Sequence, residues 1–105
     1  MKPRIREADV TKAIRDLLKH LGIWHWKEHQ GLGSQPGIAD ILGCYDGRLL
    51  AIEIKAPGKR IKPGSHQALF LEAVRQNGGI AIVADSVEAL VAGFEEYGYK
   101  LPVLL

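Results

Sequence analysis

The feature that most constrains the fold of this chain is the pair Asp46-Gly47, which lies between two strand-like segments. Asp-Gly is a favoured pair for a two-residue type I′ hairpin turn, because both turn positions require a positive φ. The flanking segments, 38–45 and 48–55, are rich in apolar side chains. The sequence therefore predicts an antiparallel hairpin whose register is set by its turn.

This turn predicts which residues face each other across the two strands. Tyr45 pairs with Arg48, and each step outward moves one residue along each strand, so that Asp40 comes to face Glu53. Directly opposed side chains lie on the same face, with Cβ atoms roughly 4.5–5.5 Å apart. Two carboxylates in this position repel each other, and a divalent cation is the obvious partner to neutralise them. A bulge or a longer turn would break this register.

Lys55 adds a cation to the predicted carboxylate pair. It follows Glu53 by two residues on the same strand and therefore lies on the same face. An ammonium group beside a metal-bound carboxylate can hold an attacking water or stabilise charge on a phosphate during hydrolysis. Asp40, Glu53 and Lys55 together form a plausible set for cleaving phosphodiesters.

Three helices are predicted outside the hairpin. Apolar residues recur at helical spacing from Glu7 to Leu21. A second helix is expected to begin with Pro63 as its first residue and to end before Gly78. A third is expected to follow a cap at Asp85 or Ser86.

Two further strands complete the predicted fold. Segment 23–29 alternates in the manner of a strand, and segment 80–84 is short and wholly apolar. The long helix before the last strand acts as a crossover, which makes the third and fourth strands parallel. The prediction is one α/β domain over residues 1–105: a mixed β-sheet with an αβββαβ core and a C-terminal helix.

Two polar residues occupy positions where the helical pattern predicts apolar ones. Glu7 stands on the apolar stripe of the first helix, and Gln67 stands on that of the second. Both are expected to point toward the sheet, where a buried polar group needs a partner. One acidic cluster with a bound metal would serve both residues. For Glu7 the alternative is a favourable interaction with the positive end of a helix dipole.

Composition sets limits on the class of protein. The single cysteine, Cys44, excludes an internal disulfide and a zinc site of several cysteines. The net charge of +2 permits a nucleic-acid partner without requiring one. No apolar run approaches the ~20 residues that cross a bilayer, and the N-terminus lacks the apolar core of a signal peptide. A cytoplasmic protein is the expectation, with no membrane partner.

The order of these motifs resembles the VRR-Nuc domain (virus-type replication-repair nuclease) of the PD-(D/E)xK nuclease superfamily. The resemblance rests on Gly37-Ile38-Ala39-Asp40, then Glu53-Ile54-Lys55, then Gln67, with Glu7 in an N-terminal helix. It extends from Glu7 to about Glu88 and implies the restriction-endonuclease-like form of the αβββαβ core. Ala39 departs from the family pattern, which often has proline before the aspartate. That proline shapes the backbone and not the chemistry.

The resemblance also implies a role for each residue. The ligands of Mg²⁺ or Mn²⁺ would be Asp40, Glu53, the Ile54 carbonyl and, through water, Glu7. Lys55 would act on the nucleophilic water, and Gln67 would orient water or substrate. Glu-x-Lys alone is a weak motif, and the combination is what makes the match specific.

The function implied is a metal-dependent DNA endonuclease of the stand-alone phage or bacterial type. Such proteins are similar to Holliday-junction resolvases, which act as homodimers on branched DNA, here in the cytoplasm of a bacterial or phage-infected cell. Three alternatives remain: a module that binds nucleic acid without cleaving it or cleaves only with a partner, a sequence-specific restriction-like enzyme, and an interaction protein with a chance Glu-x-Lys.

A basic loop is the predicted nucleic-acid contact. Lys59, Arg60 and Lys62 follow the third strand closely, so they either bind phosphates or are merely solvated. The glycines of the loop 30–37 either permit close approach of DNA or only confer flexibility.

Two aromatic side chains and the cysteine are expected to pack. Trp24 and Trp26 share one strand face, and their simplest role is in the core, with a dimer surface as the alternative. Cys44 is expected to pack within the hairpin. The four histidines show no spacing typical of metal ligands.

Overall fold

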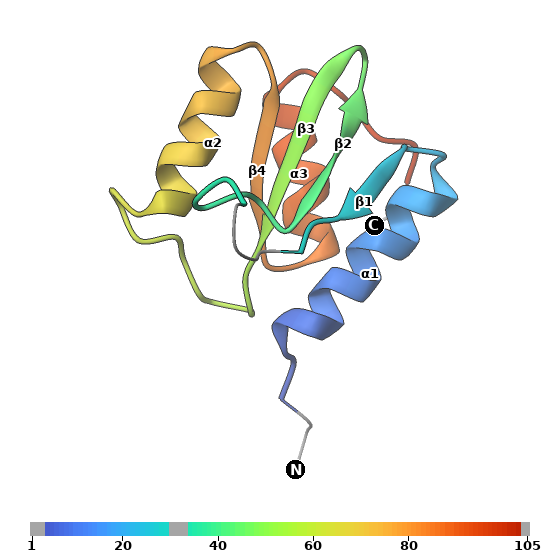
Figure 1. Cartoon of the computed structure of the whole chain (residues 1–105). Coiled ribbons are helices and arrows are strands. Elements are labelled where there is room, and N and C mark those ends of the chain that lie inside the picture. The colour runs from blue at the N-terminus through green and yellow to red at the C-terminus, as the bar shows by residue number, and fades with distance from the viewer. Residues whose placement is uncertain (1–3, 30–33, 104–105) are drawn as a thin grey trace.

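A four-stranded mixed sheet in the order β1-β2-β3-β4 forms the centre of the protein in the computed structural model, which describes residues 4–29 and 34–103 (Figure 1). Along the chain the elements are α1 (Glu7–His20), β1 (His25–Lys27), β2 (Ile41–Tyr45), β3 (Arg48–Ile54), α2 (His66–Gln76), β4 (Ile80–Ala84) and α3 (Val87–Glu96). The predicted mixed α/β fold is confirmed. Expectations for the extreme N-terminus and for positions 30–33 of the glycine loop lie outside the described residues.

The predicted hairpin register is confirmed. β2 and β3 pair antiparallel from Tyr45↔Arg48 to Ile41↔Ile52. Asp46 has φ 52° and Gly47 has φ 72°, as both central positions of a type I′ turn require. The turn therefore fixes the facing residues along the whole hairpin.

Helices cover both faces of the sheet. α1 and α3 pack on one face, where Ile14 and Phe94 are fully buried against strand residues such as Ile52. α2 packs on the other face through Leu71 and Val74. β3 and β4 are parallel, so the expectation that α2 forms a crossover between them is confirmed.

The start of α2 differs from the prediction. The helix begins at His66 and not at Pro63, because Ser65 is its N-cap and its hydroxyl accepts a hydrogen bond from the Ala68 N–H at 3.2 Å. Ser86 caps α3 in the same way, as one of the two predicted caps. In the part of the chain that the structure describes, no helix combines the length and apolar character needed to span a bilayer.

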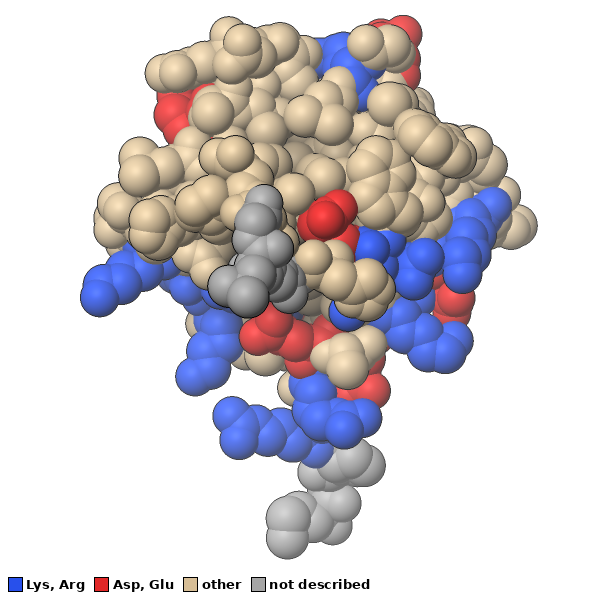
Figure 2. Space-filling model, viewed as in Figure 1, with Lys and Arg blue, Asp and Glu red and all other residues tan. Residues whose placement is uncertain are grey.

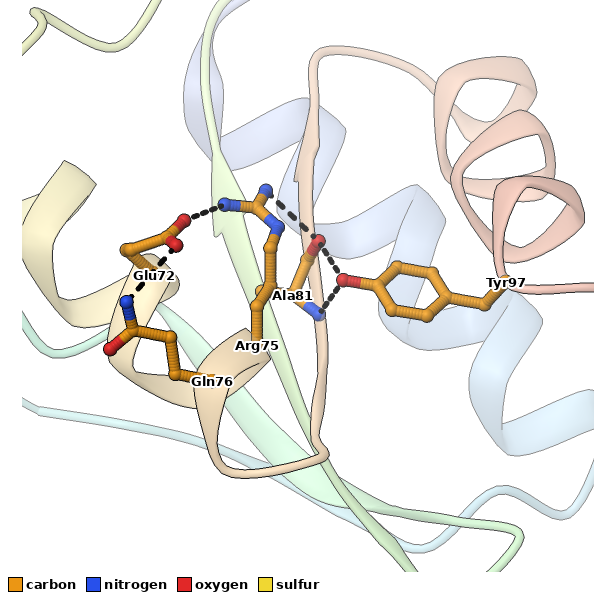
Figure 3. Close-up of polar contacts among 5 residues, drawn as sticks. All are labelled: Glu72, Arg75, Gln76, Ala81 and Tyr97. Carbon is orange, nitrogen blue, oxygen red and sulfur yellow. Dashed lines mark hydrogen bonds and ion pairs between the residues drawn. The ribbon is translucent and has the colours of Figure 1, made fainter.

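Side chains from α2 and the end of α3 cover the free edge of β4 (Figure 3). The Tyr97 hydroxyl accepts a hydrogen bond from the Ala81 N–H at 3.0 Å and lies 3.3 Å from the Ala81 carbonyl, to which it can donate. Arg75 donates to the same carbonyl at 3.4 Å and forms an ion pair with Glu72. These contacts use backbone groups that an exposed strand edge would leave available.

The opposite edge of the sheet, at β1, is uncovered. The prediction that Trp24 and Trp26 pack in the core is wrong. Trp24 is 67% exposed and Trp26 is 37% exposed, with ring centroids 5.0 Å apart. Cys44, expected to pack in the hairpin, is also exposed, as is Leu49 opposite it. The physical reason is the position of α2, which contacts β3 and β4 and does not extend over β1 on its face of the sheet, while α1 lies on the other face (Figure 1).

Candidate active site

Asp40 and Glu53 meet at the end of the hairpin opposite the turn. The ladder of facing residues reaches Ile41↔Ile52, and one more step places the two carboxylates opposite each other. Asp40 Oδ2 accepts a hydrogen bond from the Ile54 N–H at 2.8 Å. The Asp40 side chain thus supplies an acceptor to β3 just beyond the last residue pair of the β2–β3 ladder, which fixes its position beside Glu53.

Glu53 is the exceptional residue of this site because its side chain is ionisable and buried. It is only 5% exposed, and among the described residues its Oε1 has no hydrogen-bond partner. Its Oε2 lies 3.8 Å from Lys55 Nζ. Leaving a buried acceptor unsatisfied costs on the order of 1–3 kcal/mol. A cation bound to Glu53 Oε1 would therefore remove the free-energy cost of leaving this oxygen without a partner.

The electrostatics of the carboxylate pair agree with this geometry. Burial raises the pKa of Glu53, and the neighbouring charge of Asp40 raises it further, to about 8, although Lys55 opposes the shift. Two carboxylates this close are difficult to ionise together without added positive charge. The pair can bind either a proton or a metal ion.

Lys55 lies where β3 leaves the protein interior. Its side chain is 22% exposed, compared with 7% for that of Glu53, so the ammonium stands at the rim of the site. At 3.8 Å from Glu53 Oε2 it is an ion pair and not a close hydrogen bond. The ammonium can therefore also contact a bound anion.

A third carboxylate, Glu28, lies in the same row across the sheet and was missed from the sequence. The Glu28 N–H donates to the Asp40 carbonyl at 2.8 Å, which extends the β1–β2 register by one step beyond Lys27↔Ile41. Its side chain therefore projects from the same face as Asp40. Trp26 Nε1 donates to Glu28 Oε2 at 2.9 Å and holds the carboxylate along β1.

Gln67 lies at the start of α2, against the loop that leads to Asp40. Gly37 has φ +70°, and a Cβ built on it would lie 2.2 Å from the His66 carbonyl carbon and 2.6 Å from the Gln67 nitrogen. This glycine permits close packing of loop and helix, a role that the sequence alone did not indicate. Gln67 is half-buried, and no hydrogen bond within the described ranges joins it to Asp40 or Glu53.

Glu7 is exposed, so the prediction that it points into the sheet is wrong. It is the first residue of α1, whose N-terminal end extends past the sheet (Figure 1). Glu7 nevertheless lines the same groove as Asp40, a cavity of about 560 Å³ along α1. The structure places it near the site without direct contact to the carboxylate pair.

The predicted basic loop lies on the surface between β3 and α2. Lys59, Arg60 and Lys62 are all exposed, and the loop is anchored by the Gly58 N–H, which donates to Asp85 Oδ2 at 3.1 Å. Figure 2 shows that Lys and Arg side chains gather in the lower half of the visible face, on both sides of acidic side chains. The upper half of that face is mostly uncharged.

The donor set available to a metal is small. Among the described residues, no group of three or more His, Cys, Asp or Glu side chains gathers as a metal site. Asp40 and Glu53 are the pair that could hold an ion. Mg²⁺ is commonly bound through one or two carboxylates while retaining several waters, whereas a structural zinc site uses four protein ligands. The residues fit a hydrated, oxygen-bound cation.

No protein-family model matches this sequence, and no curated protein matches it significantly. What the site can do must therefore follow from its own residues. A buried carboxylate with an unsatisfied oxygen faces a second carboxylate, and an ammonium group stands at the rim. This arrangement is suited to binding a divalent cation beside an anionic substrate.

Proposed function

We propose that this protein is a metal-dependent nuclease that hydrolyses DNA phosphodiester bonds at a site formed by Asp40, Glu53 and Lys55. The observation that carries the proposal is the buried Glu53 oxygen opposite Asp40, which has no hydrogen-bond partner among the residues that the structure describes. The order of motifs that resembles the VRR-Nuc branch supports it. So does the element order of α1 to β4, which is compatible with a restriction-endonuclease-like core.

Asp40 and Glu53 would hold Mg²⁺ or Mn²⁺, with the Ile54 carbonyl and a water-mediated Glu7 as the further ligands that the resemblance implies. Such a cation, when bound, polarises a phosphate oxygen and lowers the pKa of bound water. The Lys55 ammonium would position the attacking water and stabilise negative charge developing on the phosphate. Gln67 would orient water or substrate from the start of α2.

A homodimer acting on branched DNA is the form of this activity that we propose. The exposed Trp26 on edge strand β1 and the exposed Trp24 just before that strand supply a surface for a second copy, because aromatic residues are enriched in interfaces. A two-fold dimer would present two sites to opposite strands of a junction. Selectivity for DNA structure would then come from the spacing of the two sites.

The rival function is a module that binds nucleic acid without cleaving it, or that cleaves only with a partner protein. It shares the fold, the basic surface and the metal requirement of the carboxylate pair. The two functions differ only in turnover, so a cleavage assay separates them.

The test is cleavage of a labelled four-way junction and a matching linear duplex, each with Mg²⁺, with Mn²⁺ and with EDTA. We expect metal-dependent cutting by the wild type and a loss of about 10²-fold or more in Glu53→Gln and in Lys55→Ala. Glu72→Gln and Lys100→Ala are matched controls, since both residues are exposed and Glu72 pairs only within α2. These two variants should cut like the wild type.

DNA binding without cutting under either metal would favour the rival function. Cutting that is undiminished in Glu53→Gln and Lys55→Ala would exclude this site. A junction-to-duplex ratio near one would remove the structure-selective part of the proposal and leave the nuclease.

A further inference from the structure

One groove in the described chain is walled by the exposed side of α1, next to β1. Its basic side chains are Lys12, Arg15 and Lys19 from α1 and Lys27 from β1, and its volume is about 560 Å³. Asp40 lines the same groove. The cavity therefore extends from a basic helix face to Asp40 of the proposed active site.

The helix geometry explains why these cations share one wall. Positions 12, 15 and 19 are three and four residues apart and so lie on one face of α1. The apolar face of the helix, which includes Ile14 and Leu18, is buried against the sheet and α3. At 1.5 Å per residue, Lys12 and Lys19 are about 10.5 Å apart along the axis, close to three nucleotide steps of about 3.4 Å on one DNA strand.

Not all of the positive charge in the groove is already paired. Lys12 Nζ forms an ion pair with Asp16 at 2.8 Å, and Arg15 Nε lies 3.4 Å from His25 Nε2. Lys19 and Lys27 are exposed, and within the described ranges neither forms an ion pair within 4 Å. These two ammonium groups are available to an external anion.

The charges are ordered along the groove. Glu7 stands at the start of α1 and Lys19 in its last turn, so the acidic and basic ends lie at opposite ends of the helix. The acidic end shares the groove with Asp40. In Figure 2 basic side chains surround acidic ones in the lower half of the face. A polyanion held by the basic end would extend toward the carboxylate pair.

We infer that the α1 groove, defined by Lys12, Arg15, Lys19 and Lys27, binds the phosphodiester backbone of one DNA strand and leads it to Asp40. The inference rests on the proposed function, for which it names the substrate path. It assigns binding to a surface separate from the loop that carries Lys59. Phosphate contacts of this kind fix register and orientation without reading sequence.

The test is DNA binding in EDTA, which removes cleavage from the readout. Fluorescence anisotropy with a labelled single strand and a labelled duplex would be measured across a series of NaCl concentrations. Lys19→Ala, Lys27→Ala and the double variant are compared with Lys100→Ala, an exposed lysine outside the groove. Circular dichroism checks that each variant is folded.

We expect the double variant to bind about 10-fold more weakly near 0.1 M salt. The slope of log K against log salt should fall by about 0.9 on the duplex and about 0.7 on the single strand for each phosphate that is no longer neutralised, or by about 1.8 and about 1.4 in the double variant. Lys100→Ala should leave both quantities unchanged. Binding by the double variant with the wild-type affinity and slope would overturn the inference, as would a wild type that binds no DNA.

The experiments can exclude the proposed DNA-binding groove and the proposed nuclease activity independently of each other. Binding that depends on Lys19 and Lys27 in a protein that never cuts DNA would leave the groove in place and remove the proposed function. Cutting that depends on Glu53, combined with binding insensitive to both lysines, would retain the nuclease and remove the groove.

Discussion

At the scale of single residues, Glu53 is the most unusual member of the candidate site. It sits in β3 between Ile52 and Ile54, which are both fully buried. A solvated strand face would leave a glutamate exposed, but this one is buried, and one of its oxygens has no hydrogen-bond partner in residues 4–29 and 34–103. A carboxylate is costly in such a place unless it binds a cation. The residue therefore lowers the stability of the metal-free protein.

This cost gives the metal-free protein a defined pH dependence. The pKa of Glu53 is raised from 4.5 to about 8, chiefly by burial and then by Asp40, so the folded state keeps a proton that the unfolded state releases. The stabilisation is complete below about pH 4.5 and is lost as the pH rises through about 8. With EDTA present, urea unfolding should show that the free energy of unfolding of the wild type falls by on the order of a few kcal/mol across this pH range.

Glu53→Gln is the control for that prediction, because glutamine does not titrate. The other titratable groups are the same in both proteins. Their contribution to the pH dependence therefore cancels when the unfolding free energy of the wild type is subtracted from that of the variant. We expect the free energy of unfolding of the variant to increase relative to that of the wild type as the pH rises from about 5 to about 8.5. This is the range over which Glu53 would ionise. A difference that stays constant, or changes in the other direction, would mean that Glu53 ionises normally.

At the scale of elements, the contact between the loop before β2 and the start of α2 holds the site together. Gly37→Ala should destabilise the protein by about 2–5 kcal/mol, since it adds left-handed backbone strain of about 1–2 kcal/mol to overpacking of about 1–3 kcal/mol. The overpacking arises because the new Cβ would lie 2.2 Å from the His66 carbonyl. Thermal or urea unfolding measures the loss, and cleavage should fall as Asp40 shifts.

Gly64 provides a matched control in the loop on the other side of the same helix start. It also has a positive φ, +75°, but a Cβ there would meet nothing within 4 Å. Gly64→Ala should therefore cost only the backbone strain, about 1–2 kcal/mol. Equal losses in the two variants would show that the loop can move away from α2 without penalty.

The elements that could be predicted well from the sequence are those with local signals. The Asp46-Gly47 turn determines the β2–β3 register through residues adjacent in sequence, so Asp40 and Glu53 could be paired from the sequence alone. The predicted start of α2 at Pro63 is too early. Pro63 and Ser65 both suit a helix start, and in the structure the Ser65 hydroxyl forms the cap. Strand β1 has no such turn joining it to β2, so its register could not be derived.

At the scale of the whole molecule, the features missed from the sequence depend on where distant elements lie. Glu28 joins the row of carboxylates only because β1 pairs with β2 across a long loop. The exposure of Trp24 follows from the position of α2 over the far half of the sheet. The α1 groove combines residues 12 to 19 with Lys27. The periodicity of apolar residues predicts single helices and strands. It does not predict which distant elements lie next to one another.

The exposed Trp24 and Trp26 lead to a prediction that the protein forms a homodimer. The β4 edge is covered by Tyr97 and Arg75, whereas Trp26 of β1 and Trp24 just before it are exposed to solvent. If a second copy covers them, light scattering should give twice the 11.5 kDa chain mass, alone or with junction DNA. Trp24→Ser should shift the mass toward the monomer, because it removes an exposed interface anchor and leaves the core intact.

Leu69→Ser is the matched control, since Leu69 is 61% exposed on α2, a helix that does not extend over β1. Its mass should stay that of the wild type. A wild type that remains monomeric both alone and with DNA would remove the dimer and, with it, the proposed spacing of two sites across a junction. The carboxylate pair would then have to cut one strand at a time, and the junction and the linear duplex should be cut at similar rates. Mass and the junction-to-duplex ratio should therefore change together in Trp24→Ser, while its metal dependence stays that of the wild type.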